Sequence, residues 1–129
     1  MKYENKVYLS GGLGSNWQRK VIEELGKDFI MYNPREHGLD KPKEYTAWDL
    51  YHIKICDLVF AYMETDNQSG YGLTLEIGYA KALEKTIILV DERSKADATF
   101  ESIFHIVRES ASVSFDNLDS GIEYLKSFK

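Results

Sequence analysis

The chain has 129 residues, 43% of them hydrophobic and 29% charged, which fits a single domain over residues 1–129 built around one core. Its net charge is −5, and its lysines and arginines are scattered along the sequence, so nucleic acid is not an expected partner. No apolar run reaches the length of a membrane span and the amino-terminal segment lacks the apolar core of a signal peptide, so we expect a cytoplasmic protein that does not contact a membrane.

Short apolar runs alternate with segments of helical periodicity along the whole chain. We expect strands over residues 6–10, 29–32, 57–63, 86–90 and 112–115. Helical spacing of apolar residues follows each of them, at residues 17–25, 44–56, 72–83, 100–107 and 122–125. Five such βα units predict right-handed crossovers and an α/β fold, a doubly wound five-stranded parallel sheet of the flavodoxin-like type.

Neither a metal nor a cofactor is expected. Cys56 is the single cysteine, so an internal disulfide is impossible, and we expect it to be buried packing. His37, His52 and His105 fall in separate predicted elements without the spacing of metal ligands.

A glycine-rich turn follows the first predicted strand. Ser10 is followed by Gly11, Gly12 and Gly14, directly before a helix, where backbone N–H groups can hold a phosphate or a sugar. The pattern lacks the rest of a dinucleotide or P-loop fingerprint. It therefore fits an anion site and a purely structural tight turn about equally well.

A second glycine-bearing loop runs into the helix that carries Glu76. The segment from Ser69 to Ala82 reads S-G-Y-G-L-T-L-E-I-G-Y-A-K-A, with Gly70 and Gly72 where the backbone must come close to a ligand. We expect Glu76 near the helix start, where the positive end of the helix dipole keeps a carboxylate ionised. Such a glutamate is either a nucleophile or an ordinary surface side chain that complements the dipole.

Two aspartates flank the third predicted strand. Asp49 lies on the preceding helix, where periodicity alone favours a solvated side chain. Asp57 opens the strand, and its position at the amino end directs it away from the edge where ligands bind in such a sheet.

Three ordered segments together resemble the nucleoside 2-deoxyribosyltransferase family, including its relatives that hydrolyse the N-glycosidic bond of deoxynucleoside 5′-monophosphates. They are V-Y-L-S-G-G from Val7, D-L-Y-H-I-K-I-C-D from Asp49 followed by L-V-F-A, and Y-G-L-T-L-E-I-G-Y-A from Tyr71 followed by the strand at 86–90. The resemblance spans most of the chain.

The resemblance implies roles for particular residues. Glu76 falls on the nucleophile that attacks the anomeric carbon and forms a covalent glycosyl-enzyme. Asp49 becomes the proton donor or base-orienting group, and Tyr8 the residue that orients the nucleophile. The turn from Ser10 to Gly14 would line the sugar or its 5′ substituent. The family also implies a homodimer or a higher homo-oligomer.

The chain departs from the transferases at one position. They carry an aspartate for the sugar 5′-hydroxyl six residues before the nucleophile, where this chain has Gly70. The monophosphate hydrolases use serine, so Ser69 beside Gly70 favours a phosphorylated substrate.

We therefore expect an enzyme for a small nucleoside or nucleotide that transfers the sugar to another nucleobase. Hydrolysis of 2′-deoxynucleoside 5′-monophosphates, a non-catalytic nucleotide-binding module and, less well supported, an NAD-cleaving glycohydrolase are the alternatives.

Overall fold

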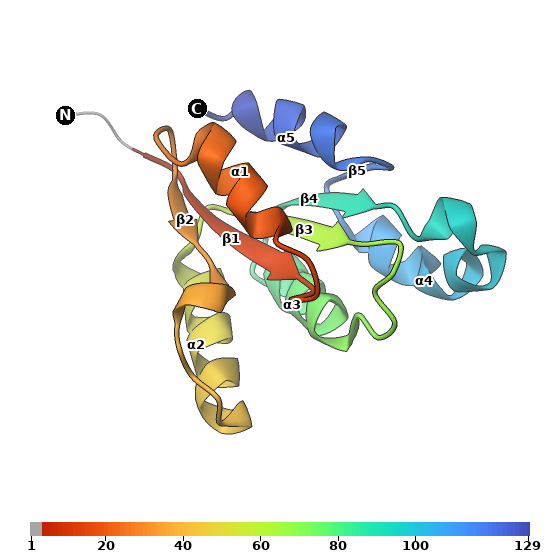
Figure 1. Cartoon of the computed structure of the whole chain (residues 1–129), viewed down its shortest axis with the longest axis horizontal. Coiled ribbons are helices and arrows are strands. Elements are labelled where there is room, and N and C mark those ends of the chain that lie inside the picture. The colour runs from red at the N-terminus through yellow and green to blue at the C-terminus, as the bar shows by residue number, and fades with distance from the viewer. Residues whose placement is uncertain (1–3) are drawn as a thin grey trace.

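The structure, a computed structural model, describes residues 4–129 and contains one five-stranded parallel sheet (Figure 1). Residues 1–3, part of the segment on which the signal-peptide prediction rests, lie outside the described residues. The strand order is β2-β1-β3-β4-β5. The strands are β1 (Lys6–Gly11), β2 (Ile30–Tyr32), β3 (Leu58–Met63), β4 (Thr86–Asp91) and β5 (Val113–Phe115). The predicted α/β fold with five parallel strands is confirmed.

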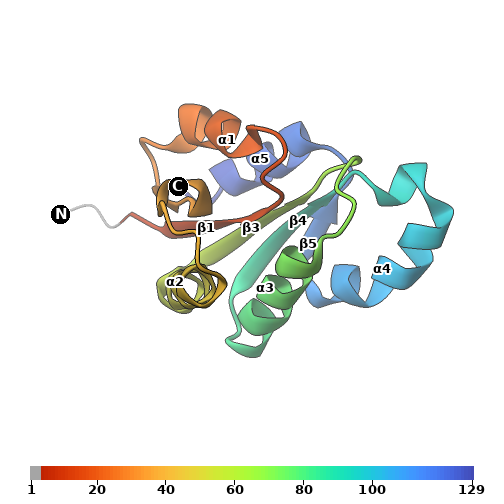
Figure 2. The ribbon, with the colours of Figure 1, turned by 60° about the horizontal axis from the view of Figure 1, so that its bottom comes forward.

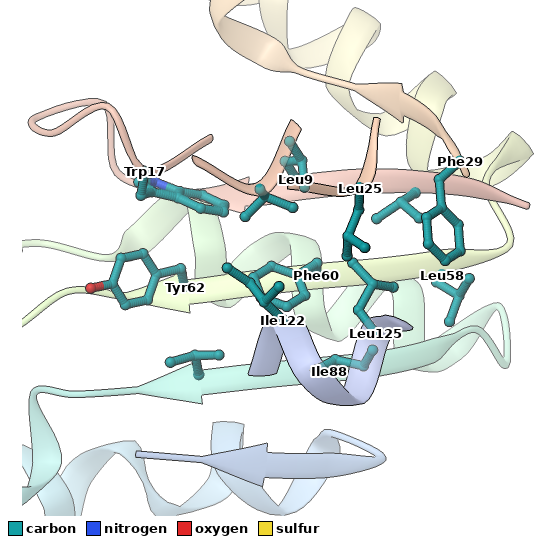
Figure 3. Packing of buried hydrophobic residues seen from close by; sticks show 13 residues of the cluster. Leu9, Trp17, Leu25, Phe29, Leu58, Phe60, Tyr62, Ile88, Ile122 and Leu125 are labelled. Atoms are coloured by element: carbon teal, nitrogen blue, oxygen red, sulfur yellow. The ribbon is translucent and has the colours of Figure 1, made fainter. Parts of the chain in front are cut away.

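Helices cover both faces of the sheet, as a doubly wound topology requires (Figure 2). On one face lie α1 (Trp17–Leu25) and α5 (Leu118–Lys126), which pack with the strands into one apolar cluster (Figure 3). On the other lie α2 (Pro42–Ile55), α3 (Tyr71–Ala82) and α4 (Ala98–Ser110), which form a second cluster. The sheet therefore separates two cores.

The alternation of side chains along β1 decides which residues can meet α3. Val7 and Leu9 belong to the cluster under α1 and α5, whereas Tyr8 belongs to the cluster under α2 and α3. Because successive side chains in a strand point to opposite faces, Ser10 shares the face of Tyr8. Both side chains are fully buried beneath α3.

Four helices begin earlier than their patterns predict, with α4 beginning at Ala98 and α5 at Leu118. The other two, α2 and α3, lie beside the site. Helix α2 begins at Pro42 rather than near residue 44, because proline has no N–H to lose in the first turn. Helix α3 begins at Tyr71, preceded by Gly70 in the left-handed conformation with φ of 71°. Glu76 is consequently the sixth residue of α3, in its second turn, and the prediction that it lies at the dipole end is wrong.

The connection from β2 to α2 contains a short 3-10 helix, Pro34–Glu36, that sequence patterns did not predict. The Asn33 side chain accepts a hydrogen bond from the Arg35 backbone N–H at its start. This turn directs the following residues over the carboxyl end of β1, the edge where ligands bind in such sheets.

Candidate active site

A cavity of about 340 Å³ opens at the carboxyl end of β1, between α2, α3 and the β2 to α2 connection. The three predicted catalytic residues, Tyr8, Asp49 and Glu76, line it together. The remaining lining residues are Gly11, Leu13, Pro34, His37, Leu39, Tyr45, Gly72 and Leu73. Segments that are far apart in the sequence thus meet at one concave surface.

Two hydroxyl groups hold the Glu76 carboxylate. The Tyr8 hydroxyl donates to Oε2 at 2.8 Å, and the Ser10 hydroxyl donates to Oε1 at 2.6 Å. Only 9% of Glu76 is exposed. Each carboxylate oxygen therefore has a fixed donor on the sheet side, and the side chain is held in one orientation.

Burial dominates the ionisation of this carboxyl group. It raises the pKa of Glu76 to about 7, while the hydrogen bonds from Ser10 and Tyr8 act in the opposite direction and the charge of Asp49 adds to the rise. Burial also raises the pKa of Tyr8, so its hydroxyl stays a donor. Because Glu76 lies in the second turn of α3, the hydrogen bonds from Ser10 and Tyr8, rather than the end of the helix, stabilise its ionised form.

Asp49 is directed into the cavity rather than into solvent, and the solvated side chain favoured by periodicity is wrong. Its side chain is 19% exposed, and its Oδ1 atom is buried without a hydrogen-bond partner among the described residues. Burial raises its pKa, partly offset by His37. Asp57 instead accepts from the Lys6 N–H at 2.8 Å, at the opposite end of the sheet.

The glycine-rich turn is divided between two cavities. Gly11 lines the cavity with Glu76, whereas Gly12 and Gly14 line an adjoining cavity of about 530 Å³, and Leu13 lines both. A side chain at Gly11 would meet the Tyr62 carbonyl oxygen at 2.6 Å, so the turn requires glycine there.

Of the predicted substrate-contacting residues Ser10, Ser69 and Gly72, only Gly72 lines the cavity that contains Glu76. Ser10 is absent from the cavity lining, and its hydroxyl is used by Glu76. Ser69 lines the adjoining cavity, separate from Glu76. Gly72 lines the cavity with Glu76 as expected.

Gly70 lies outside both cavities, and its position explains why no aspartate stands there. Its φ of 71° favours glycine, and a Cβ atom would lie 2.4 Å from the Met63 Cε atom. Its carbonyl oxygen accepts hydrogen bonds from the Thr74 N–H and hydroxyl. An aspartate side chain would therefore displace Met63 and strain the backbone rather than reach a sugar.

The adjoining cavity has an acidic lining. Glu64, Asp66 and Glu92 contribute to it, and none of its lining residues in the described chain is a lysine, arginine or histidine. The Glu64 carboxylate also accepts a hydrogen bond from the Ser15 hydroxyl. Like charges repel, so this lining opposes a phosphate group.

Three residues around the two cavities, His37, Tyr45 and Arg35, were not recognised in the sequence as site residues. His37 and Tyr45 line the cavity with Glu76, their rings parallel and 6.3 Å apart. The Arg35 guanidinium donates to the Leu13 and Ser15 carbonyl oxygens and to the Gln18 side chain at 3.0 Å, which fixes the glycine-rich turn. The sequence offered one indication of these residues. The polar segment after the second predicted strand must pass over the edge of the sheet where ligands bind.

Within residues 4–129, no group of three His, Cys, Asp or Glu side chains is placed to hold a metal ion, and no helix is long and apolar enough to cross a membrane. Cys56 is buried, and burial raises its pKa to about 11.

Solved structures with the same fold cover nearly the whole chain. A 2-deoxyribosyltransferase from Bacillus psychrosaccharolyticus is 21% identical with a TM-score of 0.66, covering 96% of this chain and 92% of its own. A 2-desoxiribosyltransferase from Leishmania mexicana is 15% identical with a TM-score of 0.68, covering 95% and 97%. A CMP N-glycosidase from Clostridium botulinum is 24% identical with a TM-score of 0.60, covering 95% and 98%.

Sequence comparison gives the family directly. No curated protein matches the chain. A family model described as nucleoside 2-deoxyribosyltransferase like matches residues 4–94, which include β1, α2, β3 and α3 and therefore every residue around Glu76 described above. The chain belongs to the nucleoside 2-deoxyribosyltransferase-like family, as its sequence segments predicted.

Proposed function

We propose that this protein cleaves the N-glycosidic bond of a 2′-deoxynucleoside and transfers the sugar to another nucleobase. The observation that carries the proposal is the buried Glu76 carboxylate, held by Tyr8 and Ser10 in the same cavity as Asp49. Membership of the family supports the same reaction class. We also propose that it acts in the cytoplasm.

The two carboxyl groups have different surroundings, and this suits them to different tasks. Both oxygens of Glu76 accept hydrogen bonds, which stabilise its ionised form against the effect of burial and suit it to the role of nucleophile. Among residues 4–129, Asp49 Oδ1 receives no hydrogen bond, so no neighbouring donor stabilises the ionised form at that atom, which suits Asp49 to the acid role. Pairs of carboxyl groups in unlike environments divide nucleophile and acid roles in this way.

The reaction then proceeds in two displacements. A Glu76 oxygen attacks C1′ of the sugar, the C1′–N bond breaks, and the Asp49 proton passes to the departing base. A second base enters, its nitrogen attacks C1′, the ester to Glu76 breaks, and the incoming base returns a proton to Asp49. Water attacking in place of the base would give hydrolysis, so transfer requires a site that excludes water.

We propose an unphosphorylated nucleoside as the substrate. The acidic lining of the cavity beside the glycine-rich turn supports this choice, because a phosphate held by that turn would face Glu64, Asp66 and Glu92. The position of Ser69 on the same cavity does not offset three carboxylates. A deoxynucleoside should therefore react faster than its 5′-monophosphate.

Incubation with a deoxynucleoside and a second free base, followed by chromatography, tests the proposal. We expect the wild-type protein to form the new nucleoside. Glu76→Gln should abolish its formation, whereas Glu101→Gln, at an exposed position of α4, should not. A 2-fluoro sugar should add its mass to the intact wild-type protein and not to Glu76→Gln. Tight nucleoside binding without base release or adduct would instead identify a binding module.

We further propose that the chain forms a homodimer through α3 and α4. These helices pack side by side (Figure 2). They expose Tyr71, Leu75, Ile103 and Ile106, with 83%, 58%, 73% and 77% of each residue accessible. Exposed apolar side chains on adjacent helices are a feature of surfaces that associate. The face borders the cavity, since Tyr71 precedes Gly72 of its lining.

A further inference from the structure

The ring of His37 is held in one orientation over the cavity that contains Glu76. Its side chain is 13% exposed. The Tyr45 ring lies parallel to it at 6.3 Å, and the Trp48 ring meets it edge-on at 5.1 Å. The β2 to α2 connection thus presents a fixed imidazole at the wall of the cavity.

A backbone hydrogen bond determines which ring nitrogen carries the proton. The Leu39 N–H donates to His37 Nδ1 at 2.9 Å. An N–H group can donate only to a nitrogen with a free lone pair, so Nδ1 is unprotonated and the ring proton lies on Nε2. His37 is therefore a fixed hydrogen-bond donor at Nε2.

Within the described part of the chain, the Nε2 atom makes no hydrogen bond, and it lies beside Asp49 Oδ1. It is 3.9 Å from Asp49 Oδ1, which is too long for a hydrogen bond. Asp49 Oδ1 is buried without a partner among residues 4–129. Buried polar atoms normally have hydrogen-bond partners, so a ligand that contacts both atoms would complete the site.

We propose that His37 is a specificity-determining residue, which donates its Nε2–H to an acceptor on the nucleobase next to the acceptor that receives the Asp49 proton. The inference rests on the proposed function, since it gives His37 a role in the part of the same cavity that would bind the nucleobase. Two neighbouring donors, His37 Nε2–H and protonated Asp49, require a base edge with two neighbouring acceptors.

Few nucleobase edges meet this requirement. The 6-oxopurines guanine and hypoxanthine present N7 and O6, both acceptors, whereas adenine presents the N7 acceptor beside an amino donor. Cytosine presents O2 and N3, both acceptors, whereas uracil and thymine carry a hydrogen on N3. An amino group or N–H facing the fixed His37 donor leaves both groups unsatisfied. The shared chemistry is an acceptor–acceptor edge, from a 6-oxopurine or from cytosine.

Binding of free bases tests the inference without requiring turnover. The probes are hypoxanthine against adenine and cytosine against uracil, followed by tryptophan fluorescence, since Trp48 contacts His37. We expect wild-type protein to prefer the acceptor–acceptor member of at least one pair by about tenfold or more. Base release from the corresponding deoxynucleosides should show the same preference in kcat/KM.

Two variants of His37 separate the effect of its N–H donor from the effect of its aromatic ring. His37→Phe retains an aromatic ring beside Tyr45 but removes the N–H, so the preference should fall to about onefold. His37→Gln places an amide that can donate or accept, so binding of the preferred base should persist while discrimination weakens. His105→Phe, at an exposed histidine on α4, is the matched control and should leave the preference unchanged.

The outcomes distinguish this inference from the proposed function. Equal wild-type binding within both pairs, or a preference that His37→Phe leaves intact, would overturn the role of His37 even if nucleosides are cleaved. A preference abolished by His37→Phe, without base release from any nucleoside, would support the role of His37 in base recognition and overturn the proposed cleavage.

Discussion

The Tyr8 hydroxyl donates a hydrogen bond to Glu76 Oε2 at 2.8 Å although the two residues are 68 positions apart. The contact joins β1 to the second turn of α3 across the carboxyl edge of the sheet. Because both residues are buried, the hydrogen bond forms where water does not compete, and it works against the desolvation of the carboxylate. The ionisation of Glu76 therefore depends on a strand that carries no reacting group itself.

Tyr8→Phe should weaken catalysis by raising the pKa of Glu76. The variant removes one of the two hydroxyl donors, and a hydrogen bond to a charged group contributes about 1.5–3 kcal/mol. The acid limb of the pH–rate profile should move to higher pH, with kcat lowered more than KM is changed. The pH dependence of base release measures this.

Tyr124→Phe is the control for that variant. Tyr124 lies on α5 across the sheet from Glu76 and contacts Phe115 and Phe128 through its ring. The pH–rate profile of Tyr124→Phe should coincide with that of the wild type. An acid limb in Tyr8→Phe identical to that of the wild type would contradict the proposed effect on Glu76.

Replacing Glu76 with glutamine should stabilise the protein at high pH. Burial raises the pKa of Glu76 from 4.5 to about 7, so the folded protein binds the proton more tightly than the unfolded chain. The contribution of this proton to the free energy of unfolding is complete below pH about 4.5 and is lost as the pH rises through about 7. Relative to wild type, Glu76→Gln should gain on the order of 3 kcal/mol between pH 4.5 and 8.

Urea unfolding of both proteins at several pH values measures this difference, and Glu101→Gln provides the control at an exposed position. A difference in unfolding free energy between Glu76→Gln and wild type that stays constant from pH 4.5 to 8 would show that Glu76 does not titrate with a raised pKa.

The sheet could be predicted because its central strands carry unbroken apolar runs. β3 is buried at every position and β4 at all but Thr86, and such runs are typical of parallel strands covered on both faces. The resemblance named Tyr8, Asp49 and Glu76, and the structure brings all three to one cavity. What it did not predict is the ionisation of Glu76, since burial rather than position along the helix governs it.

The helical spacing around Asp49 indicates the direction of its side chain. Asp49 lies four residues from both Tyr45 and Ile53, and residues four apart on a helix share a face. Ile53 is fully buried, so Asp49 follows the same face toward the sheet. His37 had no comparable signal, because its position depends on how the irregular connection around Pro34–Glu36 folds back.

Leu75→Glu should abolish the proposed homodimer while leaving the fold intact. The substitution places a charge on the exposed apolar face of α3, and burying it in an interface without a partner would be strongly unfavourable. Sedimentation equilibrium should give a dimer for the wild type and for Tyr124→Glu on α5, and a monomer for Leu75→Glu with an unchanged circular dichroism spectrum. A monomeric wild type at micromolar concentration would exclude the dimer.

Gly70→Ala should destabilise the protein by about 2 kcal/mol or more. A Cβ atom there lies 2.4 Å from the Met63 Cε atom, and the φ of 71° adds a conformational cost of about 1–2 kcal/mol for a residue with a side chain. Gly14→Ala provides the matched control, because no atom lies within 4 Å of its Cβ position, and its effect should stay within about 0.5 kcal/mol. Thermal unfolding of both variants measures the contrast. Equal stabilities would mean that Met63 moves aside and that the loop tolerates a side chain, so an aspartate for the sugar 5′-hydroxyl would be compatible with this position after all.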